Sequence, residues 1–172
     1  MVTTLPDGTR VHLRPILPAD APRLAAGLGG LSPTSVYSRF LTAKPHFTRA
    51  ELRYLTEVDM VDHVALVAVL DGAPDALAAV GRFVRDRTPG ASTAEVAILV
   101  CDALQGRELG RTLGLALAEE ARVRGIKGFS ATMLPDNRAA LALFETISAA
   151  LHGDVRTEVH QGVRELTSSV AA

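Results

Sequence analysis

The residues of this chain best suited to chemistry lie in its second half, around a glycine-containing turn. An apolar run, Thr93–Val100, precedes Gln105-Gly106-Arg107-Glu108-Leu109-Gly110-Arg111, and an amphipathic run then ends at Gly125. This pattern predicts a strand, a tight turn and a helix. The first N–H groups of a helix have no partner within it, and the helix dipole makes that end positive. Such a turn can bind a phosphate through its main chain, with Arg107 and Arg111 adding charge.

Two other phosphate-binding motifs do not match this turn. A Walker P-loop ends in Gly-Lys-Ser/Thr, and the chain contains no such sequence. A Rossmann fingerprint needs three glycines in a βαβ unit, and Gly106 and Gly110 do not satisfy its spacing. The alternative to a phosphate site is an ordinary helix start that uses glycines for turn geometry.

Composition restricts the class of protein. The 172 residues suit a single domain, residues 1–172, and 48% apolar with 22% charged residues indicates a globular chain. A net charge of −1 argues against nonspecific binding to nucleic acid or to an anionic membrane. The single cysteine, Cys101, excludes an internal disulfide framework, and no metal site is expected. Without a signal peptide or an apolar run of membrane-span length, we expect a cytoplasmic protein.

The elements around the turn follow from periodicity and from capping and turn residues. We expect an edge strand at 9–16, further strands at 62–70, 77–84, 129–134, 155–160 and 163–167, and helices at 21–28, from Ser32, from Thr48 to Glu57, and at 138–147. This order predicts a mixed α/β sheet, mostly antiparallel, with helices on its faces and a parallel pair flanking the helix that contains Gly110. Tyr37 and Phe40 are expected to pack in the core.

Three stretches resemble one known family. The turn from Gln105 to Gly110 resembles the pyrophosphate-binding signature Gln/Arg-x-x-Gly-x-Gly/Ala of the GNAT superfamily of acyl-CoA-dependent N-acyltransferases. Residues 137–144 are similar to its pattern Asn-x-x-Ala-x-x-Leu-Tyr/Phe. Residues 13–16 and 31–40 look like the N-terminal part of GNAT domains in bacterial protein lysine acetyltransferases, where the first helices form part of the acceptor wall.

The resemblance implies the GNAT fold over nearly the whole chain and acetyl-CoA as co-substrate, with an amine acceptor for which a protein lysine is one candidate. The backbone of Ile98, Leu99 and Val100 would face the pantetheine arm. The turn residues Gln105, Gly106, Arg107, Glu108, Leu109, Gly110 and Arg111 would bind the pyrophosphate. Asn137, Ala140 and Phe144 would line the pantetheine and the leaving thiolate. The sequence does not fix the oligomeric state, and a homodimer is compatible with it.

N-acylation by direct attack needs a general base for the ammonium proton. Glu95 is the first candidate because it is a carboxylate in an apolar strand, where burial would raise its pKa; the alternative is that it faces solvent. Asp102 is the reserve candidate and could equally be a turn former. Cys101 needs no nucleophilic role and reads as a small apolar residue at a strand end.

Two residues depart from the family pattern. Glu108 stands where the family has its first glycine, and its charge would repel a pyrophosphate unless the side chain points outward. Its backbone N–H would still serve if its φ is negative. Phe144 lacks the hydroxyl of the tyrosine found in many members, which can protonate the thiolate. These departures leave two alternatives open: a noncatalytic acyl-CoA-binding or sensing domain, and a structural or partner-binding domain without a cofactor site.

Overall fold

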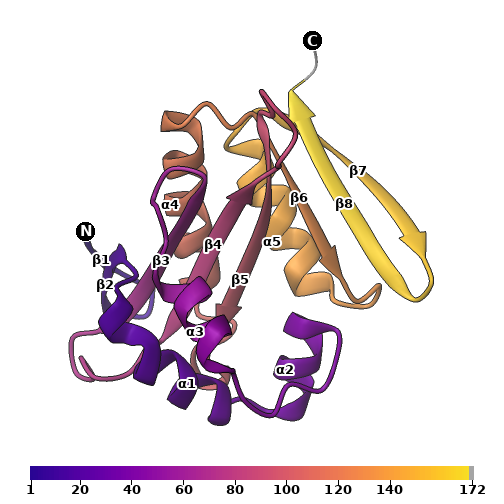
Figure 1. The fold of residues 1–172 in the computed structure, drawn as a ribbon. Helices are drawn as coiled ribbons and strands as arrows, with labels where there is room; N and C mark the ends of the chain where they lie inside the picture. The colour runs from indigo at the N-terminus through magenta and orange to yellow at the C-terminus, as the bar shows by residue number, and fades with distance from the viewer. Residues whose placement is uncertain (171–172) are drawn as a thin grey trace.

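The computed structural model describes residues 1–170 and contains an eight-stranded sheet with helices on both faces (Figure 1). The strand order is β1-β2-β3-β4-β5-β6-β8-β7. Neighbouring strands are antiparallel except for β5 and β6, which are parallel and flank helix α4 in the sequence. The predicted fold class, including its one parallel pair, is confirmed.

The strands are β1 (Val2–Thr4), β2 (Arg10–Pro15), β3 (His63–Leu70), β4 (Ala79–Arg85), β5 (Thr93–Val100), β6 (Gly128–Met133), β7 (Gly153–His160) and β8 (Val163–Val170). The helices are α1 (Ala21–Gly29), α2 (Pro33–Phe40), α3 (Arg49–Thr56), α4 (Leu109–Val123) and α5 (Arg138–Ala149), with short 3-10 turns η1 (Pro18–Asp20) and η2 (Asp102–Leu104). The strand predicted at 9–16 is present as β2, but its predicted place at the edge of the sheet is wrong, because β1 pairs with it on the outer side. Three residues of β1 are too few for a period of two to be recognised.

The sheet has one core on each face. On one face the apolar stripe of α4 packs closely, with Leu109, Leu113 and Leu117 fully buried. Gly81 of β4 allows this approach, since a Cβ there would lie 2.6 Å from Cδ1 of Leu117. On the other face, under α1 to α3, a smaller cluster contains Ile16 and Val67.

Helices α2 and α3 begin where their capping residues predict. The Ser32 hydroxyl accepts a hydrogen bond from the Ser35 N–H at 3.2 Å, and Pro33 follows at the first helical position. Thr48 and Glu51 form the predicted capping box of α3. The prediction that Tyr37 packs in the core is wrong, because its side chain is 50% exposed. With only eight residues in α2, its periodicity was too short to identify the buried face.

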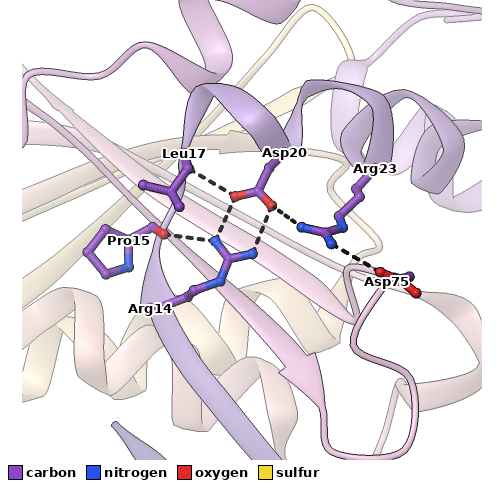
Figure 2. A network of polar contacts seen from close by, with 6 residues as sticks. All are labelled: Arg14, Pro15, Leu17, Asp20, Arg23 and Asp75. Atoms are coloured by element: carbon purple, nitrogen blue, oxygen red, sulfur yellow. Dashed lines mark hydrogen bonds and ion pairs between the residues drawn. The ribbon is translucent and has the colours of Figure 1, made fainter.

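A polar network attaches α1 to the sheet (Figure 2). The Asp20 carboxylate accepts two hydrogen bonds from the Arg14 guanidinium, at 2.6 and 2.8 Å, and one from the Leu17 N–H at 2.9 Å. Arg23 bridges from Asp20 to Asp75 in the β3–β4 loop, at 3.1 Å on each side. Arg14 is the main cause that lowers the pKa of the buried Asp20 carboxyl to about 2. The network therefore fixes the position of α1.

Candidate active site

The site lies where β5 and β6 separate. The two strands pair only from Thr93 opposite Gly128 to Glu95 opposite Ser130. Beyond that point a cleft of about 670 Å³ opens between residues 96–100 on one side and 131–134 on the other. The turn before α4 and the first residues of α4 and α5 line the rest of it. A cleft beside the carboxyl ends of parallel strands is a common ligand site in α/β proteins.

Backbone groups of β5 alternate between β4 and this cleft. The Thr93 carbonyl and the Cys101 N–H bond to residues 86 and 78 on the β4 side, at 3.0 and 2.9 Å. The Ser92 carbonyl instead bonds to Lys127 N–H on the β6 side, at 2.7 Å. Even-numbered residues of β5 therefore direct their N–H and C=O groups toward β6, where residues 98 and 100 lie beyond the last pair and have no strand partner. Of the predicted pantetheine contacts, Ile98 and Val100 present backbone to the cleft, whereas Leu99 presents only its side chain.

The turn before α4 contains two residues in the left-handed conformation. Gly106 has φ +72° and Glu108 has φ +66°, so the negative φ that was the condition for the Glu108 backbone N–H to serve is not present. A glycine adopts this conformation without strain, which explains why the family signature has glycine at that position. Glutamate pays of the order of 1 kcal/mol there. The Glu108 side chain is exposed and lies 3.7 Å from Nη1 of Arg111, so part of its charge is balanced locally.

The other residues of the turn differ in which groups they present to the cleft. Gln105, Gly106, Gly110 and Arg111 line the cleft. Arg107 does not: its guanidinium donates to Asp7 at 2.5 Å and to the Thr9 hydroxyl at 2.9 Å, so the expectation that it adds charge at the cleft is not met. The Leu109 side chain is fully buried, which leaves only its main chain for ligand binding.

Helix α5 forms the opposite wall. The Asn137 side-chain oxygen caps this helix by accepting the Ala140 N–H at 3.0 Å, which leaves its amide nitrogen free to donate. Ala140 and Phe144 follow along the cleft, and Phe144 is 2% exposed. The two helices approach closely at Gly114, where a Cβ would lie 2.7 Å from Cγ2 of Ile147.

Glu95 lines the cleft at the point where the strands part. Ala94 and Val96 on either side are buried, but Glu95 itself is exposed, which is the second of the two alternatives left open by the sequence. Side chains alternate along a strand, and Glu95 consequently points to the α1–α3 side of the sheet. There Arg39 of α2 is its charged neighbour: the Glu95 charge acts on the Arg39 guanidinium.

Asp102, the reserve candidate for the base, is held by hydrogen bonds from two other segments. Its carboxylate accepts hydrogen bonds from the Ser32 N–H at 2.7 Å, the Ser35 hydroxyl at 2.5 Å and the Gln105 amide at 3.1 Å. The hydrogen bond from Ser35, which has the largest effect, and those from Ser32 lower the pKa of Asp102. A carboxylate that accepts these bonds is a weak proton acceptor. Asp102 joins η2 to the start of α2 and thereby links α2 to the turn before α4.

Within the described residues 1–170, no three His, Cys, Asp or Glu side chains are arranged to hold a metal ion. No helix in that part of the chain is long and apolar enough to cross a membrane.

Comparison with known proteins decides the family. Residues 34–148 match the model of the acetyltransferase (GNAT) family. The chain belongs to this family. A GNAT relative, acetyltransferase Pat of Mycolicibacterium smegmatis, is 39% identical over 142 residues, which make up 83% of this chain and 42% of Pat. The chain therefore spans less than half the length of that relative.

Solved GNAT structures agree with this fold. The GNAT domain of S. lividans PAT is 32% identical with a TM-score of 0.86, covering 99% of this chain and 96% of that one. A cAMP-binding acyltransferase from Mycobacterium smegmatis is also 32% identical, with a TM-score of 0.66 over 99% of this chain and 47% of its own. The fold is shared by yncA of Salmonella typhimurium, solved with its cofactor acetyl-CoA, at 19% identity and a TM-score of 0.69 over 94% of each chain.

Sequence reasoning missed two groups that shape the site. Arg39 and Ser35 of α2 were not among the predicted residues, although both line the cleft. The wall formed by residues 131–134 was also missed. A signal for α2 was present, because its segment resembles the acceptor wall of GNAT domains. Nothing in the local pattern of β6 indicated where it would separate from β5.

Proposed function

We propose that residues 1–172 form a single N-acetyltransferase domain that transfers an acetyl group from acetyl-CoA to an amine. The observation that carries this proposal is the backbone of β5 at residues 98 and 100, which faces the cleft beyond the last pair with β6 and leads toward the N-terminus of α4. An extended arm with amide groups can pair with the strand, while a pyrophosphate meets helix N–H groups at its end. Membership in the GNAT family supports the same donor.

In this proposal each part of the cleft binds one part of acetyl-CoA. The main chain of residues 105–111, with the Arg111 guanidinium, binds the pyrophosphate. Ile98 and Val100 pair with the pantetheine arm. Asn137, Ala140 and Phe144 cover the arm from the α5 side, where the buried Phe144 ring keeps water away.

The chemistry follows from direct attack. The amine nitrogen attacks the thioester carbonyl, the N–C bond forms, the C–S bond breaks and the thiolate leaves. Glu95 accepts the ammonium proton, either directly or through water. Main-chain N–H groups of β5 that point into the cleft stabilise the oxygen on which negative charge develops. Solvent protonates the thiolate, since Phe144 has no hydroxyl.

The acceptor in this proposal is a protein lysine. Two features support it: residues 13–16 and 31–40 resemble GNAT domains of protein lysine acetyltransferases, and Glu95 is exposed, so the long side chain of a folded protein can reach it. The alternative, a noncatalytic acyl-CoA-binding or sensing domain, is supported by the two departures from the family pattern, Glu108 and Phe144.

A thiol-release assay tests the proposal. The protein is mixed with acetyl-CoA and either a lysine-containing peptide, the same peptide with every amine blocked, or small amines. Release of free thiol that depends on the unblocked lysine is the expected result. Binding of acetyl-CoA without thiol release from any acceptor would instead establish a sensing domain.

A further inference from the structure

A second, smaller cavity lies on the α1–α3 side of β4 and β5. It measures about 50 Å³ and is lined by residues of α1, α2, β4 and β5. Ala97, Leu99 and Arg39 line both this cavity and the cleft, so the two spaces are neighbours. One water molecule needs about 10–15 Å³ of such volume, so the cavity has room for a carboxylate group and a methylene.

Arg82 of β4 lines this cavity although it is a charged residue in the interior of the protein. It is only 7% exposed, and its Nη1 donates to the Leu55 carbonyl at 3.1 Å and lies 3.1 Å from Nε2 of His63. Its neighbours across the sheet, Ala65 and Ala97, have small side chains. A buried guanidinium normally has a carboxylate partner.

No such partner exists in the part of the chain that the structure describes. Among residues 1–170, neither Arg82 nor Arg39 forms an ion pair with a carboxylate. Burial, and then the charge of Arg39, lower the pKa of Arg82 to about 10, so it remains charged at neutral pH. Arg39 is half-buried over the Phe40 ring, 5.2 Å from its centroid, and faces Glu95. Three arginines, Arg23, Arg39 and Arg82, thus line one small, otherwise apolar space. Of these, Arg23 is already paired with Asp20 and Asp75.

We propose that this cavity is a subsite for the terminal carboxylate of a short dicarboxylic acyl group carried by coenzyme A, with Arg82 and Arg39 as its ligands. The inference rests on the proposed function, because the acyl group must enter from a donor bound along β5. At the inner end of the cleft an acyl group longer than acetyl meets Ala97, Leu99 and Arg39 first. The apolar side chains accept its methylenes, and the forked donors accept its carboxylate.

The transfer reaction is unchanged by this subsite. The N–C bond still forms, the C–S bond still breaks, the proton still goes to Glu95 and CoA still leaves as the thiolate. The distal carboxylate takes no part in the chemistry. The subsite therefore determines which acyl group is bound, and the catalytic step does not depend on it.

Calorimetric titration with butyryl-CoA and succinyl-CoA tests the inference. The acyl groups have similar length and differ in a terminal methyl or carboxylate. Succinyl-CoA should bind on the order of 10- to 100-fold more tightly, as expected for hydrogen bonds to a charged group. Arg39→Met should remove most of this preference while acetyl-CoA binding stays, and Arg39→Lys should restore part of it. Arg49→Met removes the same charge from an exposed site on α3 outside both cavities and should change neither affinity.

Each other outcome has a defined meaning. Equal affinity for the two donors in the wild-type protein overturns the subsite. A preference for succinyl-CoA that survives in both Arg39→Met and Arg82→Met also overturns the subsite. If Arg82→Met fails to fold, a preference that survives in Arg39→Met alone overturns it. Failure of every acyl-CoA to bind would overturn the proposed function instead.

A last arm distinguishes donor from acceptor. With acetyl-CoA fixed, peptides with and without a glutamate beside the lysine are compared. If Arg39→Met abolishes discrimination between these peptides and leaves the donor preference intact, the carboxylate belongs to the acceptor and the inference about the donor is wrong.

Discussion

The Asp102 carboxylate, just after β5, accepts a hydrogen bond from the Ser32 N–H at the start of α2, 2.7 Å away. The same carboxylate accepts from the Ser35 hydroxyl one helical turn later. Through these bonds the start of α2 is attached to the segment that leads into the turn before α4. Asp102 is thus held by hydrogen bonds between these two segments, whereas Glu95 is an exposed carboxylate at the cleft.

Substitution of the two carboxylates should separate their roles. Glu95→Gln keeps the shape and removes proton acceptance, so the rate should fall about 10²–10⁴-fold at neutral pH. The deficit should shrink as pH rises, because more of the acceptor amine is then already neutral. Asp102→Asn, the matched variant, should stay within about tenfold of wild-type turnover and keep its pH profile. Steady-state kinetics from pH 6 to 9 measures both, and wild-type turnover in Glu95→Gln would remove it from the mechanism.

Glu108 combines a strained backbone with an unfavourable charge. Glu108→Gln removes only the charge, whereas Glu108→Gly also relieves the positive φ. Both variants should bind acetyl-CoA more tightly at low salt, and the gain should shrink as salt rises, since exposed charges are screened beyond about 8 Å at physiological ionic strength. The glycine variant alone should gain stability, about 1 kcal/mol relative to the glutamine variant in denaturant unfolding. Equal stability of the two would mean that the backbone relaxes.

Much of this fold could be predicted from local patterns. Strand β5 was predicted with both ends correct, because its apolar run is bounded by turn residues. The caps Ser32 and Thr48 placed two helices, since a capping hydroxyl acts within one turn. The tight packing of β4 on α4 could not be predicted from Gly81, because the residues around a glycine in the sequence do not show which distant segment packs against it.

The site was harder to predict than the fold. The turn at residues 105–111 was found because its chemistry resides in consecutive residues. The positive φ at Glu108 could not be predicted, because glutamate rarely adopts that conformation and the sequence carried no other sign of it. The sequence left open whether Glu95 is buried or exposed, since an apolar strand in a sequence does not show which of its faces lies at a cleft. Arg39 and Arg82 meet only through the tertiary fold.

The contact between α4 and α5 should be sensitive to a single methyl group. At Gly114 a Cβ would lie 2.7 Å from Cγ2 of Ile147, whose β-branched side chain cannot turn away. Gly114→Ala should therefore lower the free energy of unfolding by about 1–3 kcal/mol. Gly110→Ala is the matched control on the same helix: its Cβ would lie 3.4 Å from Cγ2 of Val100, an ordinary contact, and stability should not fall. Equal melting temperatures for the two variants would contradict this account of helix packing.

The network around Asp20 should make stability depend on acid pH (Figure 2). Its pKa in the folded protein is depressed to about 2, so its contribution is present above the unfolded value near 3.9 and is lost as pH falls toward 2. Asp20→Asn should cost about 1–2 kcal/mol at neutral pH, allowing for screening of its half-exposed arginine partners. The cost should shrink from pH 5 to pH 2. A constant difference across that range would mean that the carboxylate charge is not what stabilises α1.

The central claim, that the cleft before α4 binds acetyl-CoA, is tested most directly by calorimetric titration of Gly110→Asp. The aspartate adds a charge beside the proposed pyrophosphate site without a steric clash at its Cβ. Gly72→Asp adds the same charge in the β3–β4 turn, where a Cβ meets nothing within 4 Å. We predict that the wild-type protein and Gly72→Asp bind acetyl-CoA alike and that Gly110→Asp binds about tenfold or more weakly. Unchanged affinity in folded Gly110→Asp, or no binding by the wild-type protein, would contradict the account.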